Sequence, residues 1–507
     1  MSLKSLLSKK FAAIVAKRIY KEANNAIVSQ QNILAYLIEE GVKTRFGKDH
    51  YFYKLKSKAE FCEKVPVRDY EGLKTYFDAV AAGEPDILWP GRPVYLSKTS
   101  GTTSGAKYIP ITKESLPEHI NAARNALLLY INNTGNADFV SGKMIFLQGS
   151  PILDRKGGIL TGRLSGIVAH HVPKYLLKNR KPSYEVNCIE DWETKVEAIV
   201  KETLPEKMTL ISGIPAWVQM YFEKLIEKSG KASIGEIFPD FSLLVYGGVN
   251  FAPYAKRFEQ LIGKKIDTVE LFPASEGFFA FQDKQDDDGL LLNVNAGMYY
   301  EFIPMDEIGK AHPKSLELSE VELGVNYALV ISTNAGLWRY NIGDLVKFTS
   351  LSPYRIRVSG RTKHYTSAFG EHVIAEEVEA AMSEAQKNSG AVVTEFTLAP
   401  NITPESGLPF HEWFIEFKEE PSDWRKFIEC LDNALRSKNP YYDDLIKGNV
   451  LDVLHVVKIV PGGFLELMKS RGKLGGQNKI PRLANDRELA SQLVKWSEES
   501  VSLSTIS

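Results

Sequence analysis

The chain has few cysteines, almost no net charge and no long apolar run. Its three cysteines among 507 residues lie far apart and lack the spacing of metal ligands, which argues against a disulfide framework or a cysteine zinc site. The formal net charge of −1 implies no bulk attraction to nucleic acid or membrane. No apolar stretch approaches the length of a membrane span, and lysines interrupt the N-terminus, so a signal peptide is not expected. We therefore expect a cytoplasmic protein.

Composition and periodicity indicate a soluble α/β protein of two or three domains. Hydrophobic residues make up 44% and charged residues 25% of the chain, which is ordinary for globular proteins. From Val94 onward, short apolar runs alternate with helical patterns, which favours a largely parallel sheet covered by helices. Functional sites in such folds gather beyond the carboxyl ends of the strands. The expected buried strands are 143–150, 241–248, 267–276 and 326–333.

The two ends of the chain differ from this middle part. The first sixty residues have helical patterns, including an N-terminal amphipathic helix and a second pattern, 32–50, expected to break at Gly47. After Arg355 a basic, glycine-punctuated stretch leads into helices and strands typical of a separate α+β domain. We place the domains at 1–358 and 359–507, with a hinge near Val358–Gly360.

The stretch TSGTTSGAK, residues 99–107, holds five hydroxyl side chains, two glycines and one lysine in nine positions. It is no Walker A loop, because only three residues separate Gly101 from Gly105 and Tyr108 follows the lysine. It is not a GxGxxG dinucleotide fingerprint either. Backbone N–H groups and hydroxyls in such a loop can hold a polyphosphate, with Lys107 as a point charge. A flexible surface loop is the other interpretation.

Two acidic residues follow expected strands. Glu276, in LFPASEG, could hold magnesium against phosphate oxygens, or serve as an ordinary acid near a helix N-terminus. Asp344, in GLWRYNIGD, could accept hydrogen bonds from both ribose hydroxyls at a turn, or be a simple β-turn aspartate. Neither residue decides the function alone, and the order of the motifs along the chain carries more weight.

In this order the motifs resemble those of the adenylate-forming superfamily. They resemble more closely the plant auxin-responsive promoter family of acyl-acid amido synthetases. TSGTTSGAKYIPIT is similar to that family's phosphate loop, and LFPASEG to its Tyr-Ala-Ser-Ser-Glu motif, with Phe272 for the tyrosine and Pro273 inserted. LWRYNIGD resembles its Tyr-Arg-Tyr-Arg-Val-Gly-Asp motif, with Asn341 for an arginine. The C-terminal stretch VVKIVPGGFLELMKSRGKLGGQNKIPRL aligns the family's catalytic lysine with Lys479.

The resemblance implies an AMP-forming ligase that uses ATP and Mg²⁺. It would adenylate a small carboxylic acid, release pyrophosphate and transfer the acyl group to an amino acid. The implied fold is a large N-terminal α/β domain with mixed or parallel sheets flanked by helices, and a smaller mobile α+β C-terminal lid with the catalytic lysine. No nucleic acid, membrane or obligatory protein partner is expected.

The resemblance also implies a role for each candidate site residue. Lys479 would act on the α-phosphate and the acyl oxygen, Glu276 would hold magnesium, and Lys107 would place a positive charge at the phosphates. The residues expected to bind the nucleotide are Ser100, Gly101, Thr102, Thr103, Gly247, Gly248, Phe272, Ser275, Asp344 and Arg361.

Two other functions stay open. One is thioester formation with coenzyme A, and the other is a catalytically silent protein that only binds ligand. The presence of Glu276, Asp344 and Lys479 argues against the silent protein. The close C-terminal match favours the amide over the thioester.

Overall fold

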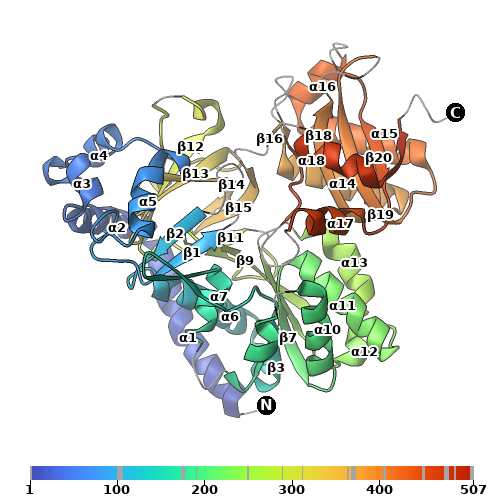
Figure 1. Ribbon diagram of the computed structural model, residues 1–507, viewed down its shortest axis with the longest axis horizontal. Helices are drawn as coiled ribbons and strands as arrows, with labels where there is room; N and C mark the ends of the chain where they lie inside the picture. Colours follow the sequence, from blue (N-terminus) through green and yellow to red (C-terminus); the bar gives the residue numbers. More distant parts are fainter. Residues whose placement is uncertain are drawn as a thin grey trace. The chain divides into compact units, whose positions relative to one another are not determined.

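The computed structural model describes two compact units of the chain. Unit 1 comprises Met1–Val249 and Leu261–Arg357, and unit 2 comprises Asn250–Gln260 and Val358–Ser507 (Figure 1). The boundary between Arg357 and Val358 falls inside a strand, β15. The described residues are 3–99, 107–172, 177–189, 191–247, 251–287, 289–310, 312–361, 365–366, 373–401, 404, 407–447, 451–472, 479–484 and 487–502.

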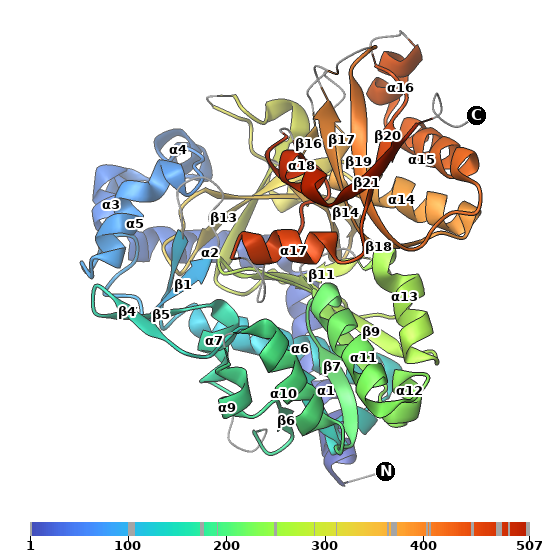
Figure 2. The same ribbon diagram turned by 45° about the vertical axis from the view of Figure 1, so that its right-hand side comes forward.

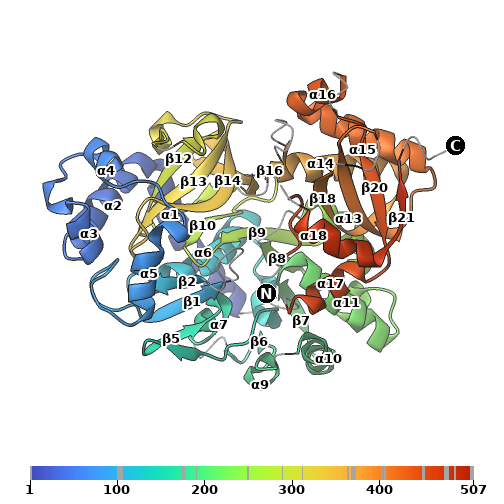
Figure 3. The same ribbon diagram turned by 45° about the horizontal axis from the view of Figure 1, so that its top comes forward.

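Unit 1 is built around an eleven-stranded sheet of mixed direction. Strands β6, β3, β7, β8 and β9 are neighbours in this order and run parallel. Strands β9, β10, β11 and β15 pair antiparallel, as do β12, β13 and β14 (Figure 3). The expected largely parallel sheet is therefore correct for one half, and 326–333 forms β13 in the antiparallel half. The bounds are β3 Lys143–Phe146, β6 Arg180–Lys181, β7 Met208–Ser212, β8 Leu243–Gly247, β9 Asp267–Pro273, β10 Phe278–Phe281, β11 Leu290–Leu292, β12 Met298–Pro304, β13 Asn326–Thr333, β14 Tyr340–Leu351 and β15 Tyr354–Arg361.

Helices cover both faces of the parallel half, which explains its continuous apolar strands. Four successive residues of β7 and of β8 are buried, as expected where both faces of a strand are covered. The N-terminal helix α1 (Leu3–Asn24) and α6 (Leu116–Thr134) form one core with β7, β8 and β9. Helices α10 (Trp192–Thr203) and α11 (Pro215–Ser229) lie beside β7, and α12 (Ile234–Ile237) packs on α11 (Figure 2).

A second sheet in unit 1 has the order β2-β1-β5-β4. It contains the two strands that flank the expected phosphate loop. Its bounds are β1 Tyr95–Thr99, β2 Lys107–Ile111, β4 Asp154–Lys156 and β5 Ile159–Gly162. The remaining helices of unit 1 are α2 Ala26–Gly41, α3 Arg45–Asp49, α4 Lys58–Lys64, α5 Lys74–Ala81, α7 Leu164–Ala169 and α9 Tyr184–Asn187. Short 3₁₀ helices lie at Phe52–Lys54, Glu71–Leu73, Asp138–Ser141, Met305–Glu307 and Leu318–Glu320.

The helix break expected at Gly47 falls at Gly41 instead. A Cβ atom on Gly41 would lie 2.7 Å from the rings of Phe52 and Trp338, so the glycine allows tight packing. The next helix, α3, is capped by Thr44, whose hydroxyl accepts the backbone N–H of Gly47 at 2.9 Å. Gly47 therefore lies inside α3, and the preceding helix α2 ends at Gly41.

Unit 2 has the expected α+β composition, with helices on both faces of a four-stranded sheet. The strand order is β18-β19-β20-β21. Helices α14 and α15 pack on one face around Trp413, and α17 and α18 on the other around Phe414 (Figure 2). Unit 2 also takes most of α13 (Ala252–Ile262) from the middle of the chain. The bounds are β16 Tyr365–Thr366, β17 Val373–Ile374, α14 Ala375–Ser389, β18 Val392–Asn401, β19 Phe410–Glu419, α15 Trp424–Lys438, α16 Pro440–Lys447, β20 His455–Ile459, α17 Gly463–Ser470, α18 Glu488–Leu493, a 3₁₀ helix Val494–Trp496 and β21 Ser497–Val501.

Within the described ranges, no helix has both the length and the apolar character that crossing a bilayer requires.

Candidate active site

The expected phosphate loop joins the two strands of an antiparallel hairpin. Thr99 at the end of β1 pairs with Lys107 at the start of β2. The Lys107 ammonium lies 5.5 Å from the ring centroid of Tyr70, a cation–π distance. The Tyr70 hydroxyl accepts the backbone N–H of Tyr108 at 3.1 Å. Tyr70 therefore holds the start of β2 and its lysine. Ser100, Gly101, Thr102, Thr103 and Gly248 lie outside the described residues.

Glu276 lies in the tight turn between β9 and β10. Ala274 and Gly277 exchange backbone hydrogen bonds of 2.8 and 3.3 Å across this turn. The Ser275 hydroxyl lies 2.8 Å from the Ser97 hydroxyl, and both side chains are buried. Because Ser97 belongs to β1, which leads into the phosphate loop, this bond fixes the turn with Glu276 beside the hairpin. Two motifs that are far apart in the sequence thus meet in one place.

Strands β8 and β9 bring Gly247 and Phe272 to the same edge of the sheet. Gly247 pairs with Leu271, and a Cβ atom on Gly247 would lie 2.4 Å from the Leu271 carbonyl oxygen. Only glycine allows this approach. The Phe272 ring is 8% exposed and packs edge-to-face on Phe279 with centroids 5.0 Å apart. Its contact with adenine stays a prediction.

Asp344 lies in a β-bulge and not in a turn. Residues 342–344 of β14 face the single residue Leu329 of β13, because the pairing register shifts there. Gly343 has a φ of 85°, and its N–H donates to the Asn341 side chain at 2.9 Å. Bulges redirect side chains beside functional sites, which fits the proposed ribose contact. In the sheet, β15, β11 and β10 separate β14 from β9, so strand order does not place Asp344 next to Glu276.

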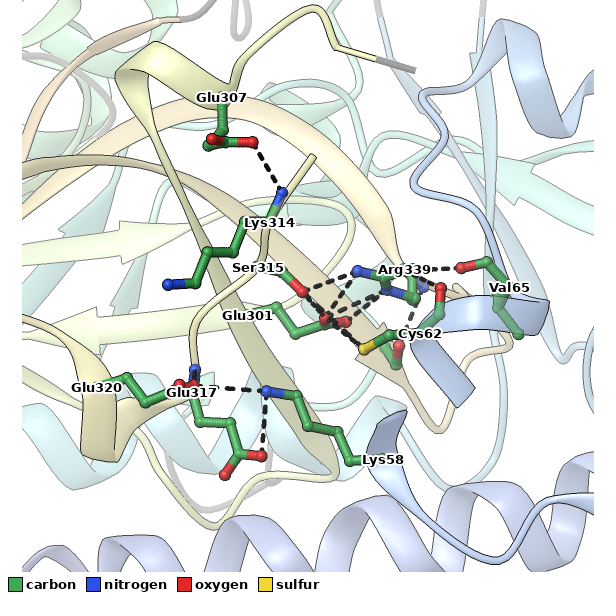
Figure 4. Close-up of polar contacts among 11 residues, drawn as sticks. Lys58, Cys62, Val65, Glu301, Glu307, Lys314, Ser315, Glu317, Glu320 and Arg339 are labelled. Atoms are coloured by element: carbon green, nitrogen blue, oxygen red, sulfur yellow. Dashed lines mark hydrogen bonds and ion pairs between the residues drawn. The ribbon is translucent and has the colours of Figure 1, made fainter. Parts of the chain in front are cut away.

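Arg339, directly before β14, anchors that strand (Figure 4). It is 4% exposed and has a left-handed φ of 43°, which is uncommon for a residue other than glycine. Its guanidinium donates to Glu301 at 2.9–3.2 Å and to the Ser315 hydroxyl at 2.9 Å. Two further N–H groups donate to the carbonyls of Cys62 and Val65 at 2.8 Å. All five guanidinium N–H groups are bonded.

In this cluster, burial and the neighbouring negative charges shift the pKa of Arg339 in opposite directions. Burial lowers the pKa of Arg339, but the Glu301 carboxylate, Cys62 and Tyr299 together raise it by more, so the guanidinium stays charged. Burial and the same carboxylate raise the pKa of the Cys62 thiol to about 11. A cavity of about 460 Å³ opens beside the cluster, lined by Lys58, Lys314 and Ser315 among others. The cluster therefore ties the start of β14 to α4 and β12.

In unit 2, Lys479 lies just before a short segment, residues 481–484, that runs along β18. Leu398 donates to the Arg482 carbonyl and accepts from Ala484, both at 2.9 Å. The Thr397 hydroxyl donates to the Pro481 carbonyl at 2.6 Å. Lys479 itself is exposed. The segment therefore presents this lysine from a backbone that is fixed on the sheet.

The side chain of Arg482 anchors this segment to its surroundings in unit 2. It is 8% exposed and pairs with Glu395 and, at 3.3 Å, with Glu379. It also donates to the Tyr254 hydroxyl at 3.0 Å, and its guanidinium lies 4.4 Å from the Phe396 ring centroid. Burial lowers the pKa of Arg482, but the two carboxylates and the tyrosine raise it by more. Only two residues separate this buried anchor from the exposed lysine.

Sequence reasoning missed Ser97, Arg339 and Arg482 because it considered which side chains would touch the nucleotide. Arg339 and Arg482 lie inside the motifs used above and Ser97 lies two residues before the phosphate loop, so a polar residue within or beside a motif was the available signal. Arg361 ends β15, and its side chain lies outside the described part.

The described residues hold no group of three or more His, Cys, Asp or Glu side chains that could bind a metal ion. Magnesium in nucleotide enzymes takes one or two carboxylates and completes its shell with phosphate oxygens and water. Glu276, half-buried beside the phosphate hairpin, fits this kind of site. It would share the ion with a polyphosphate.

Three domain models of one family match the chain in the expected order. These are the GH3 family N-terminal domain at residues 15–179, the central domain at 291–361 and the C-terminal domain at 376–488. The chain belongs to the GH3 family of acyl-acid amido synthetases. The GH3 matches begin in α1, include the phosphate hairpin of unit 1, and continue through the β18–β20 part of unit 2.

Curated relatives of this GH3 chain are distant but cover nearly its whole length. Jasmonoyl–L-amino acid synthetase JAR4 of Nicotiana attenuata is 21% identical, over 91% of this chain and 92% of the relative. Indole-3-acetic acid-amido synthetase GH3.15 of Arabidopsis thaliana is 24% identical, over 90% of each.

Solved structures show that this GH3 chain has the fold of adenylate-forming ligases. The GH3.15 acyl acid amido synthetase has a TM-score of 0.79 at 17% identity and covers 96% of this chain. A 2-hydroxyisobutyryl-CoA ligase in the postadenylation state has a TM-score of 0.58 at 16% identity and covers 93%. The fold class expected from the sequence is confirmed.

Proposed function

We propose that this protein adenylates a carboxylic acid with ATP and then transfers the acyl group to an amino acid. The observation that carries the proposal is the hydrogen bond between Ser97 and Ser275. It joins motifs 178 residues apart, so that the strand leading into the phosphate loop lies beside the turn with Glu276. A site for a polyphosphate and its metal ion needs the phosphate loop and the Glu276 carboxylate in one place.

In the first half-reaction, a carboxylate oxygen attacks the α-phosphorus of ATP and pyrophosphate leaves. Negative charge builds on the phosphoryl oxygens, so cations and N–H donors that are already in place lower the barrier. Lys107 at the start of β2 and Lys479 in unit 2 would supply two of these cations. Magnesium, when bound at Glu276, would neutralise charge on the phosphates. Asp344 would hold the ribose.

In the second half-reaction, an unprotonated amine attacks the acyl-adenylate and AMP leaves. The competing acceptor is coenzyme A, whose 3′-phosphate needs a basic groove. The basic run that the sequence suggests for such a groove is that of the hinge, with Arg355, Arg357 and Arg361. Arg355 is 2% exposed and forms ion pairs with Asp283 and Asp287. Because Arg355 neutralises these two carboxylates inside unit 1, its charge does not serve the 3′-phosphate of coenzyme A. This supports the amino acid as the acceptor.

The test follows exchange of labelled pyrophosphate into ATP, with Mg²⁺ and a panel of carboxylic acids. We expect acid-dependent exchange, and AMP and an N-acyl amino acid when amino acids are added. Release of ADP and phosphate would contradict adenylation for every substrate. With amino acids and coenzyme A present together, a thioester as the main product would overturn the acceptor while leaving adenylation in place.

A further inference from the structure

Helix α1 carries its large apolar side chains on the outside of the protein. Its inner face packs against α6 with mostly small residues, at most 9% exposed: Ala12, Val15, Ala16, Ile19 and Ala23. Its outer face is larger and exposed: Leu6 at 45%, Leu7 at 59%, Phe11 at 48% and Ile14 at 69%. A surface helix normally has the reverse arrangement. Figure 1 shows α1 beside α6 in unit 1.

The helix is fixed in this orientation. The Tyr20 hydroxyl donates to the Asp283 carboxylate at 2.7 Å and accepts from the Asn133 amide at 2.7 Å. Asp283 is itself buried and paired with Arg355. Rolling α1 to bury its outer face would break these bonds. The large apolar side chains therefore face outward in the folded protein, and something outside this fold must cover them if they are to leave water.

The same helix holds an unusual concentration of positive charge. The first 21 residues contain six basic residues and no acidic residue, although the whole chain has a formal net charge of −1. The first acidic residue, Glu22, forms an ion pair with Arg18 at 3.9 Å. The basic residues are Lys4, Lys9, Lys10, Lys17, Arg18 and Lys21.

We propose that α1 docks this protein on an anionic lipid surface. The helix would lie in the plane of the interface, with its outer apolar side chains among the acyl chains and its lysines at the headgroups. A second copy of this chain is a poorer partner, because two such basic faces would oppose each other. The expectation of no membrane partner rested on net charge and on the absence of a membrane span. Interfacial docking depends on neither.

The test is co-sedimentation of the full chain with vesicles. We expect binding to vesicles of phosphatidylserine and phosphatidylcholine, little binding to phosphatidylcholine alone, and release by 0.5 M NaCl, where charges are screened within a few ångströms. The double variant Leu7→Gln/Ile14→Gln should lower the partition coefficient at least tenfold. The double variant Lys10→Glu/Lys17→Glu should lower it by a similar or larger factor.

Matched controls use residues of similar exposure on other elements. Leu323 and Val494 are 56% and 54% exposed, and Leu323→Gln/Val494→Gln should bind vesicles like the parent protein. Lys228→Glu/Lys231→Glu, on exposed positions, controls for net charge. All variants should keep the parent's pyrophosphate exchange without vesicles, which separates this proposal from the proposed function.

Three results would overturn the proposal. The first is no vesicle binding by the parent, and the second is equal binding by the parent and both α1 variants. The third is a concentration-dependent dimer in light scattering that Leu7→Gln/Ile14→Gln abolishes, which would assign the outer face of α1 to a second copy.

Discussion

Two buried arginines hold the two segments on which the proposed chemistry depends, and their partners differ. Arg339 in unit 1 has one carboxylate, one hydroxyl and two backbone carbonyls. Arg482 in unit 2 has two carboxylates, a tyrosine hydroxyl and one carbonyl. The first cluster is formally neutral and the second carries one excess negative charge. Removal of Arg339 therefore leaves one buried carboxylate without this counter-ion, whereas removal of Arg482 leaves one buried and one partly buried carboxylate.

The largest effect is expected for Arg482→Met. It leaves the buried Glu379 and the partly buried Glu395 without this counter-ion, and breaking a buried ion pair costs about 3–5 kcal/mol. Urea unfolding should show this loss of stability. Hydrogen exchange should rise in residues 396–401 and 480–484 while β12–β14 stay protected. The exposed Arg425→Met is the control. An unchanged exchange pattern in unit 2 would show that Arg482 does not anchor the lysine segment.

Lys479→Ala tests what the anchored segment presents. Removing one cation aimed at developing phosphoryl charge should cost about 2.7–4 kcal/mol of barrier, or roughly 10²–10³ in rate. Single-turnover adenylation should slow while stability stays unchanged, because the side chain is exposed. Lys495→Ala, another exposed lysine of unit 2, should keep the parent rate. A normal adenylation rate in Lys479→Ala would show that the catalytic lysine is elsewhere.

Two variants of the Arg339 cluster distinguish the role of Arg339 in balancing the charge of Glu301 from its role in positioning β14. Arg339→Met should destabilise the protein by about 3 kcal/mol, because the buried Glu301 carboxylate loses its counter-ion. The double variant Arg339→Met/Glu301→Met should recover much of this loss, since no charge stays buried. We still expect it to raise KM for ATP, because β14 loses its tie to α4. Normal stability and a normal KM for ATP in the double variant would show that Arg339 only balances the charge of Glu301.

The buried His119, which has no counter-ion among the residues that the structure describes, extends the comparison to pH. Burial lowers the pKa of His119 from 6.5 to about 4. As pH falls below 6.5 the unfolded chain takes up this proton first, so stability present above pH 6.5 is lost progressively toward pH 4. The expected loss is about 2 kcal/mol between pH 7 and pH 5. The free energy of unfolding of His119→Leu, measured at pH 7 and at pH 5, should lack this loss. The same pH dependence in His119→Leu and in the parent protein would contradict the prediction.

The sequence predicts the fold well where a pattern is local. The apolar runs at 143–150, 241–248 and 267–276 form β3, β8 and β9, and the helical patterns after residue 375 form α14 and α15. Strand direction was harder to predict. Seven of the eight residues of β13 are buried, so this antiparallel strand has the same pattern as a parallel one. The bulge at Asp344 depends on the register with β13, which no local pattern contains.

The candidate site was predictable only in part, for the same physical reason. Residues that would touch the nucleotide lie in short motifs, and these could be named. Their supports come from distant parts of the chain: Glu301 is 38 residues from Arg339, and Glu379 is 103 residues from Arg482. Nothing near either arginine in the sequence identifies its partner, so a single sequence shows a buried arginine only as a polar residue in a motif.

The helix that unit 2 takes from the middle of the chain affects how this protein can be recombined. The smaller unit is not one continuous piece of sequence, because α13 precedes the last strands of unit 1. An exchange of residues 358–507 between two homologues would pair a foreign Arg482 with the resident Tyr254. Any chimera that is to keep this contact must carry residues 250–260 as well. The unit that folds together and the unit that a single crossover can inherit are therefore different.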